Sequence, residues 1–393
     1  MKVAHFVESF SPLSETFVYD YIQGLEKEGV DNYVVTLVRH HEIERPFAKV
    51  KTLTLQKKYH PKRWLRKFKV LSGLLAEEEI YHDWYRDQLY AHLQAIQPDV
   101  LHAQFGPSGV LLAPVAKQLN IPLVVTFHGY DFSVLMKEPY WYQQYQSLFA
   151  QVALLIGVSN YVCHKLTEAG ASKKKLIKIY NAIDTKKFSV LCDGEKKDKH
   201  HIVCVHVGRL VEKKDPITLL KAFSLCLREI DDTYQLSLVI VGDGPLLSEV
   251  KSLISSLHME KSVELILGLA HDDIPQLLQK ADIYTQHSVT ASNGDEEGMG
   301  ISFAEASMMG LPVVATLHNG IPEVILDGET GLLVAEKDTR AMADSMLKLC
   351  YDETLRNSLG QAGIKHITQH FSQAEYIKKH MIAFENILVQ GGR

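Results

Sequence analysis

Short β-rich runs alternate with longer amphipathic stretches along this 393-residue chain, and this alternation limits the fold more than any other feature. Strands separated by helix-length segments pair in parallel, so the pattern predicts an α/β fold. The alternation stops at residues 193–201, a polar and charged run, and then begins again. We therefore predict two successive doubly wound, Rossmann-like parallel-sheet domains that face each other across a cleft, because ligands bind outside the carboxyl ends of such strands.

Each half contains five apolar runs that we predict to be strands. In the first half these are residues 2–7, 33–38, 100–103, 123–127 and 154–158. In the second half they are residues 202–207, 236–241, 263–267, 283–286 and 312–315. Helices are expected at residues 17–27, 84–96, 161–169 and 301–309, with a terminal helix at 373–388. The predicted domains are residues 1–190 plus 374–393, and residues 191–373.

Composition excludes several classes of protein. The longest apolar run, around residues 148–158, is interrupted by Gln151 and is shorter than the ~20 residues of a membrane span. The first ten residues carry one lysine and few apolar residues before Glu8, which argues against a signal peptide. The five cysteines form no Cys-x-x-Cys pair, so a disulfide framework or a zinc site is not expected. We expect a cytoplasmic protein in a reducing compartment.

The most informative segment is 296–314, EEGMGISFAEASMMGLPVV. Gly298 and Gly300 precede a predicted helix that begins near Ile301, and a glycine loop at a helix start offers backbone N–H groups to a phosphate. Glu305 lies about one turn into that helix, where a carboxylate can accept hydrogen bonds from sugar hydroxyls, and Glu297 lies before it. The alternative is an early glutamate that only favours the helix dipole.

Two further loops follow strands of the second half. VGRLVEKKDP places Arg209 and Lys214 directly after the first strand, where an arginine fork and a lysine point charge match a diphosphate. VGDGP places Gly242 and Gly244 after the next strand, in a tight turn that lets the backbone approach a neighbouring group. The alternative for Arg209 and Lys214 is that they are exposed basic side chains without a ligand. The alternative for Gly242 and Gly244 is an ordinary glycine-containing loop.

Taken in order, these motifs resemble a known family. GRLVEKK, VGDGP, two glutamates seven residues apart and then HNGIPEVILDGETGLLV are similar to the donor domain of retaining family 4 glycosyltransferases of the GT-B fold. The segment 181–188 resembles the one that closes the N-terminal domain of that family. The segment 10–18, FSPLSETFV, resembles a subgroup that builds bacterial exopolysaccharides, including colanic-acid-type transferases.

The resemblance implies a donor site in the second domain. Arg209 and Lys214 would hold the donor diphosphate, and Glu305 would bind the ribose of the nucleotide. Glu297, together with backbone amides near Gly300 and Ile301, would contact the donor sugar and its phosphate. The loop glycines complete this expected donor site: Gly242, Gly244 and Gly298.

The resemblance also implies an acceptor side in the first domain. His128, in TFHGYD, matches the histidine at the acceptor wall, and Gly129 and Asp131 complete its loop. Ser14 and Glu15 stand where the family has a glycine-rich loop. Glu297, His128, Arg209 and Lys214 are the expected catalytic residues.

Some alternatives and departures accompany this site. Ser14 is also suited to cap a helix, the commoner role for a serine there. His128 is also suited to be a structural histidine in a strand-end turn. Asp215 replaces the glycine that usually follows the lysine, and this departure obscures the donor geometry.

The resemblance implies retaining transfer of a sugar from a UDP- or GDP-sugar to a glycan or lipid-linked acceptor, as in bacterial surface polysaccharide synthesis. No Asp-x-Asp pair occurs in the chain, so we expect no metal and no other cofactor. A GT-B-fold nucleotide-sugar epimerase is the main alternative. A dinucleotide-dependent oxidoreductase is a poor one because no Gly-x-Gly-x-x-Gly follows the first strand, and a non-catalytic binding module is the least favoured.

Charge is unevenly distributed along the chain. Residues 1–190 carry a net charge of +5 and the remainder −10. Between Lys49 and Lys69 there are nine basic residues and no acid, interleaved with Trp64 and other apolar residues. Such a stretch is typical of a surface for anionic lipid headgroups, so we expect peripheral association with the inner face of the membrane. A solvated helix or an oligomer contact is the alternative. Nucleic acid is not an expected partner, because the pI is near 6.4.

Overall fold

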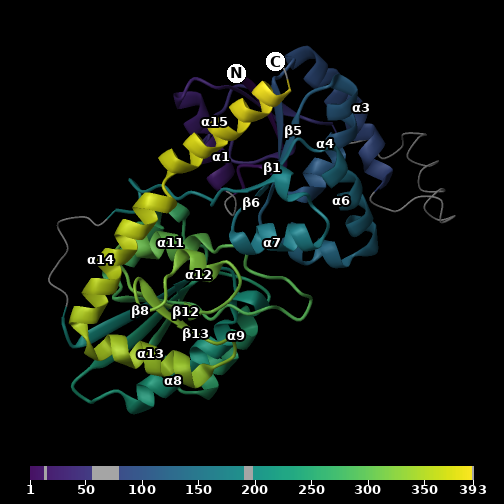
Figure 1. Cartoon of the computed structure of the whole chain (residues 1–393). Coiled ribbons are helices and arrows are strands. Elements are labelled where there is room, and N and C mark those ends of the chain that lie inside the picture. The colour runs from purple at the N-terminus through teal and green to yellow at the C-terminus, as the bar shows by residue number, and fades with distance from the viewer. Residues whose placement is uncertain (13–15, 55–78, 190–197, 392–393) are drawn as a thin grey trace. The chain divides into compact units, whose positions relative to one another are not determined.

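The computed structural model describes residues 1–12, 16–54, 79–189 and 198–391, and the chain forms two compact units (Figure 1). The N-terminal unit comprises Met1–Val158, Val162–Ile179 and Ile377–Arg393. The C-terminal unit comprises Ser159–Tyr161 and Tyr180–Tyr376. Each unit is built around its own parallel sheet, as the two rounds of strand–helix alternation predict.

The sheet of the N-terminal unit has seven strands in the order β3-β2-β1-β4-β5-β6-β7, all parallel. Every residue of β4, β5 and β6 is buried, which is why these strands are continuous apolar runs in the sequence. The strands are β1 (Lys2–Phe10), β2 (Asp31–Arg39), β3 (Val50–Thr52), β4 (Val100–Gln104), β5 (Leu123–Phe127), β6 (Leu154–Gly157) and β7 (Leu176–Lys178).

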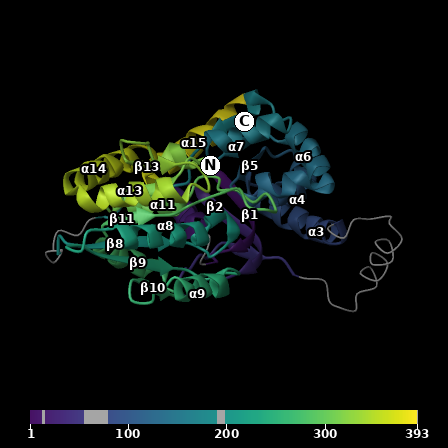
Figure 2. The ribbon, with the colours of Figure 1, turned by 90° about the horizontal axis from the view of Figure 1, so that it is seen from below.

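Helices cover both faces of this sheet (Figures 1 and 2). On one face, Gly109 of α4 packs so closely on β5 that an added Cβ would lie 2.8 Å from Val125. On the other face, the rings of Tyr21 of α1 and His380 of α15 are in tilted contact, with centroids 4.7 Å apart. The helices are α1 (Thr16–Lys27), α3 (Glu79–Ile96), α4 (Gly106–Leu119), α5 (Tyr130–Ser133), α6 (Pro139–Gln151), α7 (Asn160–Glu168) and α15 (Gln373–Gln390), with short 3-10 turns at Leu135–Lys137 and Lys173–Lys175.

The sheet of the C-terminal unit has six parallel strands in the order β10-β9-β8-β11-β12-β13. This is the strand order of a dinucleotide-binding doubly wound sheet, in which ligands bind at the carboxyl ends next to the first strand, here β8. The strands are β8 (His201–Val207), β9 (Gln235–Val241), β10 (Val263–Ile266), β11 (Ile283–Thr285), β12 (Val313–Thr316) and β13 (Gly331–Val334).

Seven α-helices and two 3-10 turns within the described residues accompany these strands, and α13 and α14 follow the last of them. Helices α8 and α13 pack on each other over the core that Phe223, Leu238 and Met346 share. The helices are α8 (Pro216–Glu229), α9 (Leu247–Ser256), α10 (Ile274–Lys280), α11 (Ile301–Met308), α12 (Ile321–Val324), α13 (Thr339–Tyr351) and α14 (Glu353–His370), and the 3-10 turns are η4 (Glu212–Lys214) and η5 (His271–Asp273).

The two doubly wound parallel sheets confirm the predicted fold class. All ten predicted strands and all five predicted helices are present with ends shifted by a few residues. The sequence pattern missed β3, β7 and β13, each of three or four residues.

The units divide at Ile179 and Tyr376, whereas the linker composition suggested residues 190 and 373. The ring of Tyr180 stacks on Phe371 with centroids 4.4 Å apart. The backbone N–H of Ile183 donates to the carbonyl of Phe371 at 3.0 Å. These contacts attach residues 180–183 to the C-terminal unit, before the polar run begins.

Candidate functional site

The loop that carries Arg209 is held by backbone contacts with the turn after β9. Gly208 N–H donates to Val241 O at 3.0 Å, and Leu210 N–H donates to Asp243 O at 2.9 Å. A Cβ on Gly242 would lie 1.9 Å from Gly208 O, so only glycine permits this approach. A Cβ on Gly244 would likewise lie 2.5 Å from Leu210 O. The two predicted donor-site glycines therefore shape the Arg209 loop by letting two strand-end loops touch.

Arg209 itself is exposed. Within residues 1–12, 16–54, 79–189 and 198–391, its guanidinium forms no hydrogen bond or ion pair with another side chain. As far as the described residues go, its donors face no protein partner at the carboxyl end of β8, where an anionic ligand of such a sheet binds.

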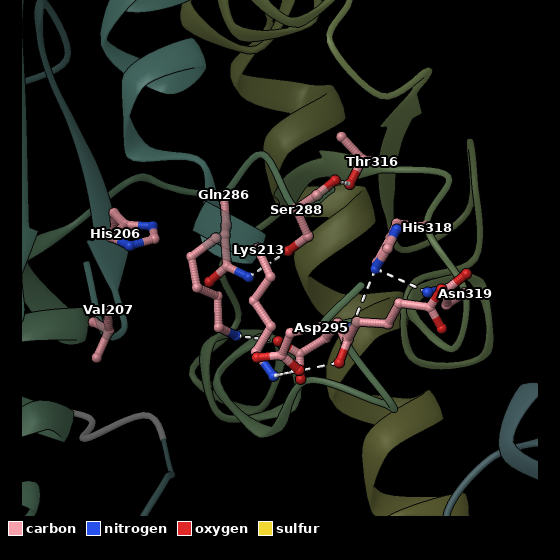
Figure 3. Close-up of polar contacts among 12 residues, drawn as sticks. His206, Val207, Lys213, Gln286, Ser288, Asp295, Thr316, His318 and Asn319 are labelled. Atoms are coloured by element: carbon pink, nitrogen blue, oxygen red, sulfur yellow. Dashed lines mark hydrogen bonds and ion pairs between the residues drawn. The ribbon is translucent and has the colours of Figure 1, made fainter. Parts of the chain in front are cut away.

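The two lysines of η4 pair with different carboxylates, and buried Lys213 points toward Asp295 (Figure 3). Lys213 Nζ lies 3.0 Å from Asp295 Oδ1 and 3.3 Å from the carbonyl of Glu296. Lys214 Nζ forms an ion pair with Glu297, and the side chains of this pair are only 12% and 13% exposed. The predicted diphosphate lysine and the predicted catalytic glutamate are thus brought together.

Electrostatics keep Glu297 ionised. Burial alone would raise the pKa of its carboxyl, but Lys214, then Lys213 and finally His318 lower the pKa, and the net value is about 2. A carboxylate with this pKa carries a full negative charge at neutral pH, so Lys214 is electrically neutralised by it.

Asp215, the departure from the family pattern, has a clear structural role. Its backbone is left-handed, with φ 35° and ψ 60°, a conformation that suits glycine and that aspartate tolerates. Its carboxylate accepts a hydrogen bond from Thr218 N–H at 3.0 Å and caps α8. Aspartate therefore keeps the turn after Lys214 that glycine would make and adds a helix cap.

Helix α11 begins beside this ion pair. Gly300 adopts φ 84° just before Ile301, and a Cβ there would lie 2.5 Å from the Phe303 ring. No side chain of the described residues caps this helix start, so its first amides are available to an anion. Lys214 Nζ lies 6.0 Å from the centre of the Phe303 ring, in the first turn of the helix.

Glu305 is buried on α11 and has a partner that the sequence did not indicate. Its Oε1 lies 2.8 Å from His271 Nε2. Lys187 Nζ lies 2.8 Å from His271 Nδ1 and 2.6 Å from Asp272 Oδ1. Because an ammonium group only donates, Nδ1 of His271 accepts and Nε2–H donates to Glu305. The carboxylate that we expect to bind ribose is therefore held by a neutral histidine.

His206, near the end of β8 (Figure 3), is fully buried and feels the charge of Lys214. Its Nδ1 lies 3.2 Å from the carbonyl of Thr285. Burial, and after it the charge of Lys214, lowers the pKa of His206 to about 4. The ring is neutral at physiological pH and adds no charge beside Lys214.

In the N-terminal unit, His128 follows β5 and packs between aromatic rings. The ring centroids of Phe105 and Phe17 lie 4.6 Å and 5.1 Å from that of His128. Its Nε2 lies 2.7 Å from Gln104 Oε1, an acceptor, so Nε2 carries a proton. Burial and, to a smaller extent, His380 lower the pKa of His128 to about 3. The histidine is therefore neutral and oriented by Gln104.

Asp131 organises the loop around His128. Its carboxylate accepts hydrogen bonds from Gly129 N–H at 2.9 Å, His128 N–H at 3.1 Å and Gly106 N–H at 3.0 Å. Burial raises the pKa of Asp131, and the backbone hydrogen bonds oppose this rise. Asp131 thus joins the strand-end loops of β4 and β5, a positioning role within the predicted acceptor side.

Several predicted features lie wholly or partly outside the described residues. Ser14 and Glu15 do so, as does most of the basic stretch from Lys49 to Lys69. Lys49 itself lies 2.6 Å from Asp31 and 3.6 Å from Glu26, so its charge is shared with two carboxylates.

Within residues 1–12, 16–54, 79–189 and 198–391, no three His, Cys, Asp or Glu side chains lie close enough to hold a metal ion. None of the helices in that part of the chain is both long and apolar enough to cross a membrane.

Comparison with known proteins gives two family matches. Residues 14–187 match Glycosyltransferase Family 4, and residues 193–366 match Glycosyl transferases group 1. A putative colanic acid biosynthesis glycosyltransferase of Salmonella typhimurium is 28% identical over 95% of this chain and 97% of its own length. An amylovoran biosynthesis glycosyltransferase of Erwinia amylovora is 31% identical over 67% of this chain and 64% of its own length.

Solved structures show the same architecture. Anabaena HepE, solved in complex with UDP, has a TM-score of 0.78 at 19% identity and covers 98% of this chain and 100% of its own. Sucrose-phosphate synthase from Thermosynechococcus elongatus has a TM-score of 0.77 at 16% identity. The match covers 99% of this chain and 100% of the synthase. These likenesses establish the GT-B fold.

Proposed function

The chain belongs to the glycosyltransferases in which a family 4 part precedes a group 1 part, and we propose that it transfers a sugar from a UDP- or GDP-sugar to a glycan or lipid-linked oligosaccharide. In this proposal the transfer retains the configuration of the donor sugar and requires no metal ion. Its relatives in colanic acid and amylovoran synthesis place it among the glycosyltransferases of polysaccharide biosynthesis. The donor, the stereochemistry and the acceptor are the parts that the proposal adds.

One observation carries the donor part of the proposal. The ion pair of Lys214 and Glu297 lies beside the uncapped start of α11, with Lys214 Nζ 6.0 Å from the Phe303 ring of the first helical turn. Arg209 is exposed in the same β8–η4 loop. An arginine fork, a lysine and helix N–H groups together match the four or so negatively charged oxygens of a nucleoside diphosphate.

The nucleotide part rests on Glu305 and on a structural neighbour. Glu305 is held on α11 by His271, and a buried carboxylate is a strong acceptor for a pair of ribose hydroxyls. Anabaena HepE has been solved with UDP-glucose as well as with UDP. This likeness in fold supports testing UDP-sugars first and GDP-sugars second.

The proposed chemistry combines what these side chains can stabilise with the same-face attack that the family resemblance implies. The bond between the anomeric carbon and the donor phosphate oxygen breaks, and Arg209 and Lys214 stabilise the negative charge that the departing diphosphate gains. The acceptor oxygen forms its bond to the anomeric carbon from the same face, and its proton passes to the departing phosphate oxygen. Glu297 orients the donor sugar, and neutral His128 lines the acceptor side with Gly129 and Asp131.

The cations explain why no metal is included in the proposal. Arg209 supplies a positive charge at the leaving group, and Lys214, although its charge is balanced by Glu297, supplies ammonium N–H donors there. Together they perform the task of a divalent cation in enzymes that clamp a diphosphate between carboxylates. Chelation would therefore leave turnover unchanged.

We also propose that the acceptor is reached at the inner face of the cell membrane. The support is the run of nine basic residues from Lys49 to Lys69, since such a run attracts anionic lipids. Binding to vesicles with a phosphatidylserine fraction at low salt, but not to neutral vesicles, is the expected result. Equal binding to both kinds of vesicle, or to neither, would contradict this part.

The test of the proposed function is product formation. The full chain is incubated with UDP- and GDP-sugars and an acceptor, with and without EDTA, and nucleotide release is followed together with the anomeric configuration of the product by NMR. We expect acceptor-dependent release, the configuration of the donor in the product, and no effect of EDTA. A new sugar nucleotide formed without acceptor would instead indicate an epimerase, and inversion or EDTA sensitivity would refute the mechanism.

A further inference from the structure

The loop that carries Glu297, residues 289–300, is attached to η4 along one side. Val289 N–H donates to Lys213 O at 3.0 Å. Ser292 donates to the Glu212 carboxylate twice, from its N–H at 2.7 Å and from its hydroxyl at 2.6 Å. Together with the Lys213–Asp295 ion pair, these contacts fix the early part of the Glu297 loop.

The other side of the Glu297 loop is attached to a histidine, His318 (Figure 3), and to a glutamate, Glu336, that the proposed mechanism does not use. Glu336, just after β13, accepts a hydrogen bond from Thr290 N–H at 3.1 Å. Its second oxygen lies 2.6 Å from His318 Nδ1. His318 Nε2 lies 3.2 Å from the backbone nitrogen of Glu297 and 2.9 Å from Asn319 Nδ2. Glu336 and His318 thus connect β13 to the backbone of Glu297.

The roles of the two ring nitrogens of His318 follow from their partners. The backbone N–H of Glu297 can only donate, so Nε2 accepts, and Nδ1–H donates to Glu336. The His318 side chain is 0% exposed, so water cannot replace either partner. Glu336 therefore fixes the tautomer and the orientation of the ring, as an outer carboxylate does for histidines that hold metals.

The backbone next to His318 is equally close to the Glu297 loop. A Cβ on Gly320 would lie 2.0 Å from the carbonyl oxygen of Gly298. The turn formed by residues 318–320 therefore lies directly against the loop at Glu297 and Gly298, and a displacement of His318 would move Glu297 with it.

We propose that His318 and Glu336 are positioning residues that hold the Glu297 backbone, and with it the carboxylate and the start of α11, in the geometry required for turnover. This inference rests on the proposed function, because it assigns these two residues to the same site. The Glu336 carboxylate is paired with His318, and His318 accepts from the backbone of Glu297, so both act through the protein rather than as cations for a diphosphate. Their loss would therefore lower kcat more than it raises the KM for the donor.

Three variants and a control test this inference. His318→Phe keeps a planar ring and removes both nitrogens, whereas Glu336→Ala removes only the outer carboxylate, which is 32% exposed, so this variant is expected to fold. Glu336→Gln keeps an acceptor oxygen for Nδ1–H. His201→Phe is the control, because His201 Nε2 is paired with Ser237 Oγ at 2.8 Å at the opposite, amino end of β8.

The first readout is steady-state kinetics. His318→Phe and Glu336→Ala should lower kcat by about 10- to 100-fold, the usual cost of losing an outer positioning contact, with the donor KM within about threefold. Glu336→Gln should recover most of kcat, and His201→Phe should match the wild type. Unchanged kcat in both His318→Phe and Glu336→Ala, or a kcat loss equal to that of His201→Phe, would overturn the proposal.

The second readout does not depend on activity. Hydrogen exchange of the peptide that contains Glu297 should be faster in His318→Phe and Glu336→Ala and unchanged in His201→Phe. Exchange at the wild-type rate in all variants would overturn the proposal even if kcat fell. Absence of turnover by the wild type with every donor would refute the proposed function instead, and the exchange rates would still decide whether His318 holds this loop.

Discussion

Replacing Lys214 by methionine removes one charge from a buried ion pair while keeping most of the side-chain volume. Glu297 would remain in a site where its side chain is only 13% exposed, without its main partner. With Lys214 present, the pKa of Glu297 is about 2, compared with an ordinary value of 4.5. Lys213 already has Asp295 as its partner at 3.0 Å, so it cannot fully compensate.

The expected magnitude follows from the pKa of Glu297. A pKa lowered from 4.5 to about 2 corresponds to about 3 kcal/mol at 1.36 kcal/mol per unit. Breaking a buried pair by removing one partner costs a similar ~3–5 kcal/mol, because it leaves an uncompensated charge. We expect Lys214→Met to lower the free energy of unfolding of the C-terminal unit by about 3 kcal/mol at pH 7, and Lys214→Met with Glu297→Gln to recover most of this loss.

The stability difference between the wild type and Lys214→Met should change with pH in a definite direction. In the wild type, the pKa of Glu297 is below its unfolded value, so its stabilisation is present above pH 4.5 and is lost as the pH falls toward 2. In Lys214→Met, burial would dominate and raise the pKa of Glu297 above its unfolded value. The difference in stability between wild type and variant should therefore shrink as the pH is lowered from 7 to 4.5.

Urea unfolding followed by far-UV circular dichroism measures this difference. The three tryptophans, at positions 64, 84 and 141, all belong to the N-terminal half, so their fluorescence follows the other unit as an internal control. If Lys214→Met lowered the free energy of unfolding at pH 7 by less than about 1 kcal/mol, the Lys214–Glu297 pair would contribute no more than a solvent-exposed ion pair, and the reasoning would be refuted. A double variant as unstable as Lys214→Met would refute it as well.

Three other predictions concern different parts of the chain. Glu305→Ala should raise the donor KM by about tenfold or more with kcat within about threefold in steady-state assays, because it removes binding rather than chemistry. Gly242→Ala should lower the melting temperature and weaken donor binding, because the added Cβ would lie 1.9 Å from Gly208 O. Gly363→Ala is the control and should keep donor affinity, because its Cβ would lie 3.4 Å from the nearest atom, Ser307 Cβ. Burial lowers the pKa of His5 from 6.5 to about 4, against a smaller opposing effect of Asn32. The ring is neutral in both states above pH 6.5, so the N-terminal unit should lose about 3 kcal/mol of stability as the pH falls from 6.5 toward 4. Replacing His5 by glutamine should flatten that acid slope in fluorescence-detected unfolding.

The strands that sequence reasoning identified differ physically from those it missed. β4 and β5 are buried along their whole length, so each is a continuous apolar run that is visible in the sequence. β3 and β7 are three-residue edge strands with partly exposed side chains. Segments that short show no alternation, and only pairing with β2 or β6 makes them strands.

The candidate site shows a similar division. Lys214 and Glu297 carry a chemical signature in the sequence, although their ion pair forms only when η4 and the Glu297 loop meet. His271 and His318 have no such signature, because each acquires its role from a carboxylate more than 15 residues away in the chain. Asp215 obscured the donor motif in the sequence, and its left-handed backbone shows that the turn expected of glycine is kept.

Calorimetric titration of UDP-, GDP- and ADP-sugars into wild type and Arg209→Ala tests the central claim most directly. The account predicts that one nucleotide class binds the wild type, and that Arg209→Ala weakens its Kd by about 10- to 100-fold, the value of one charge-assisted hydrogen-bonding group. Binding of that nucleotide with the same Kd in both proteins would contradict the claim that the donor diphosphate lies at the end of β8.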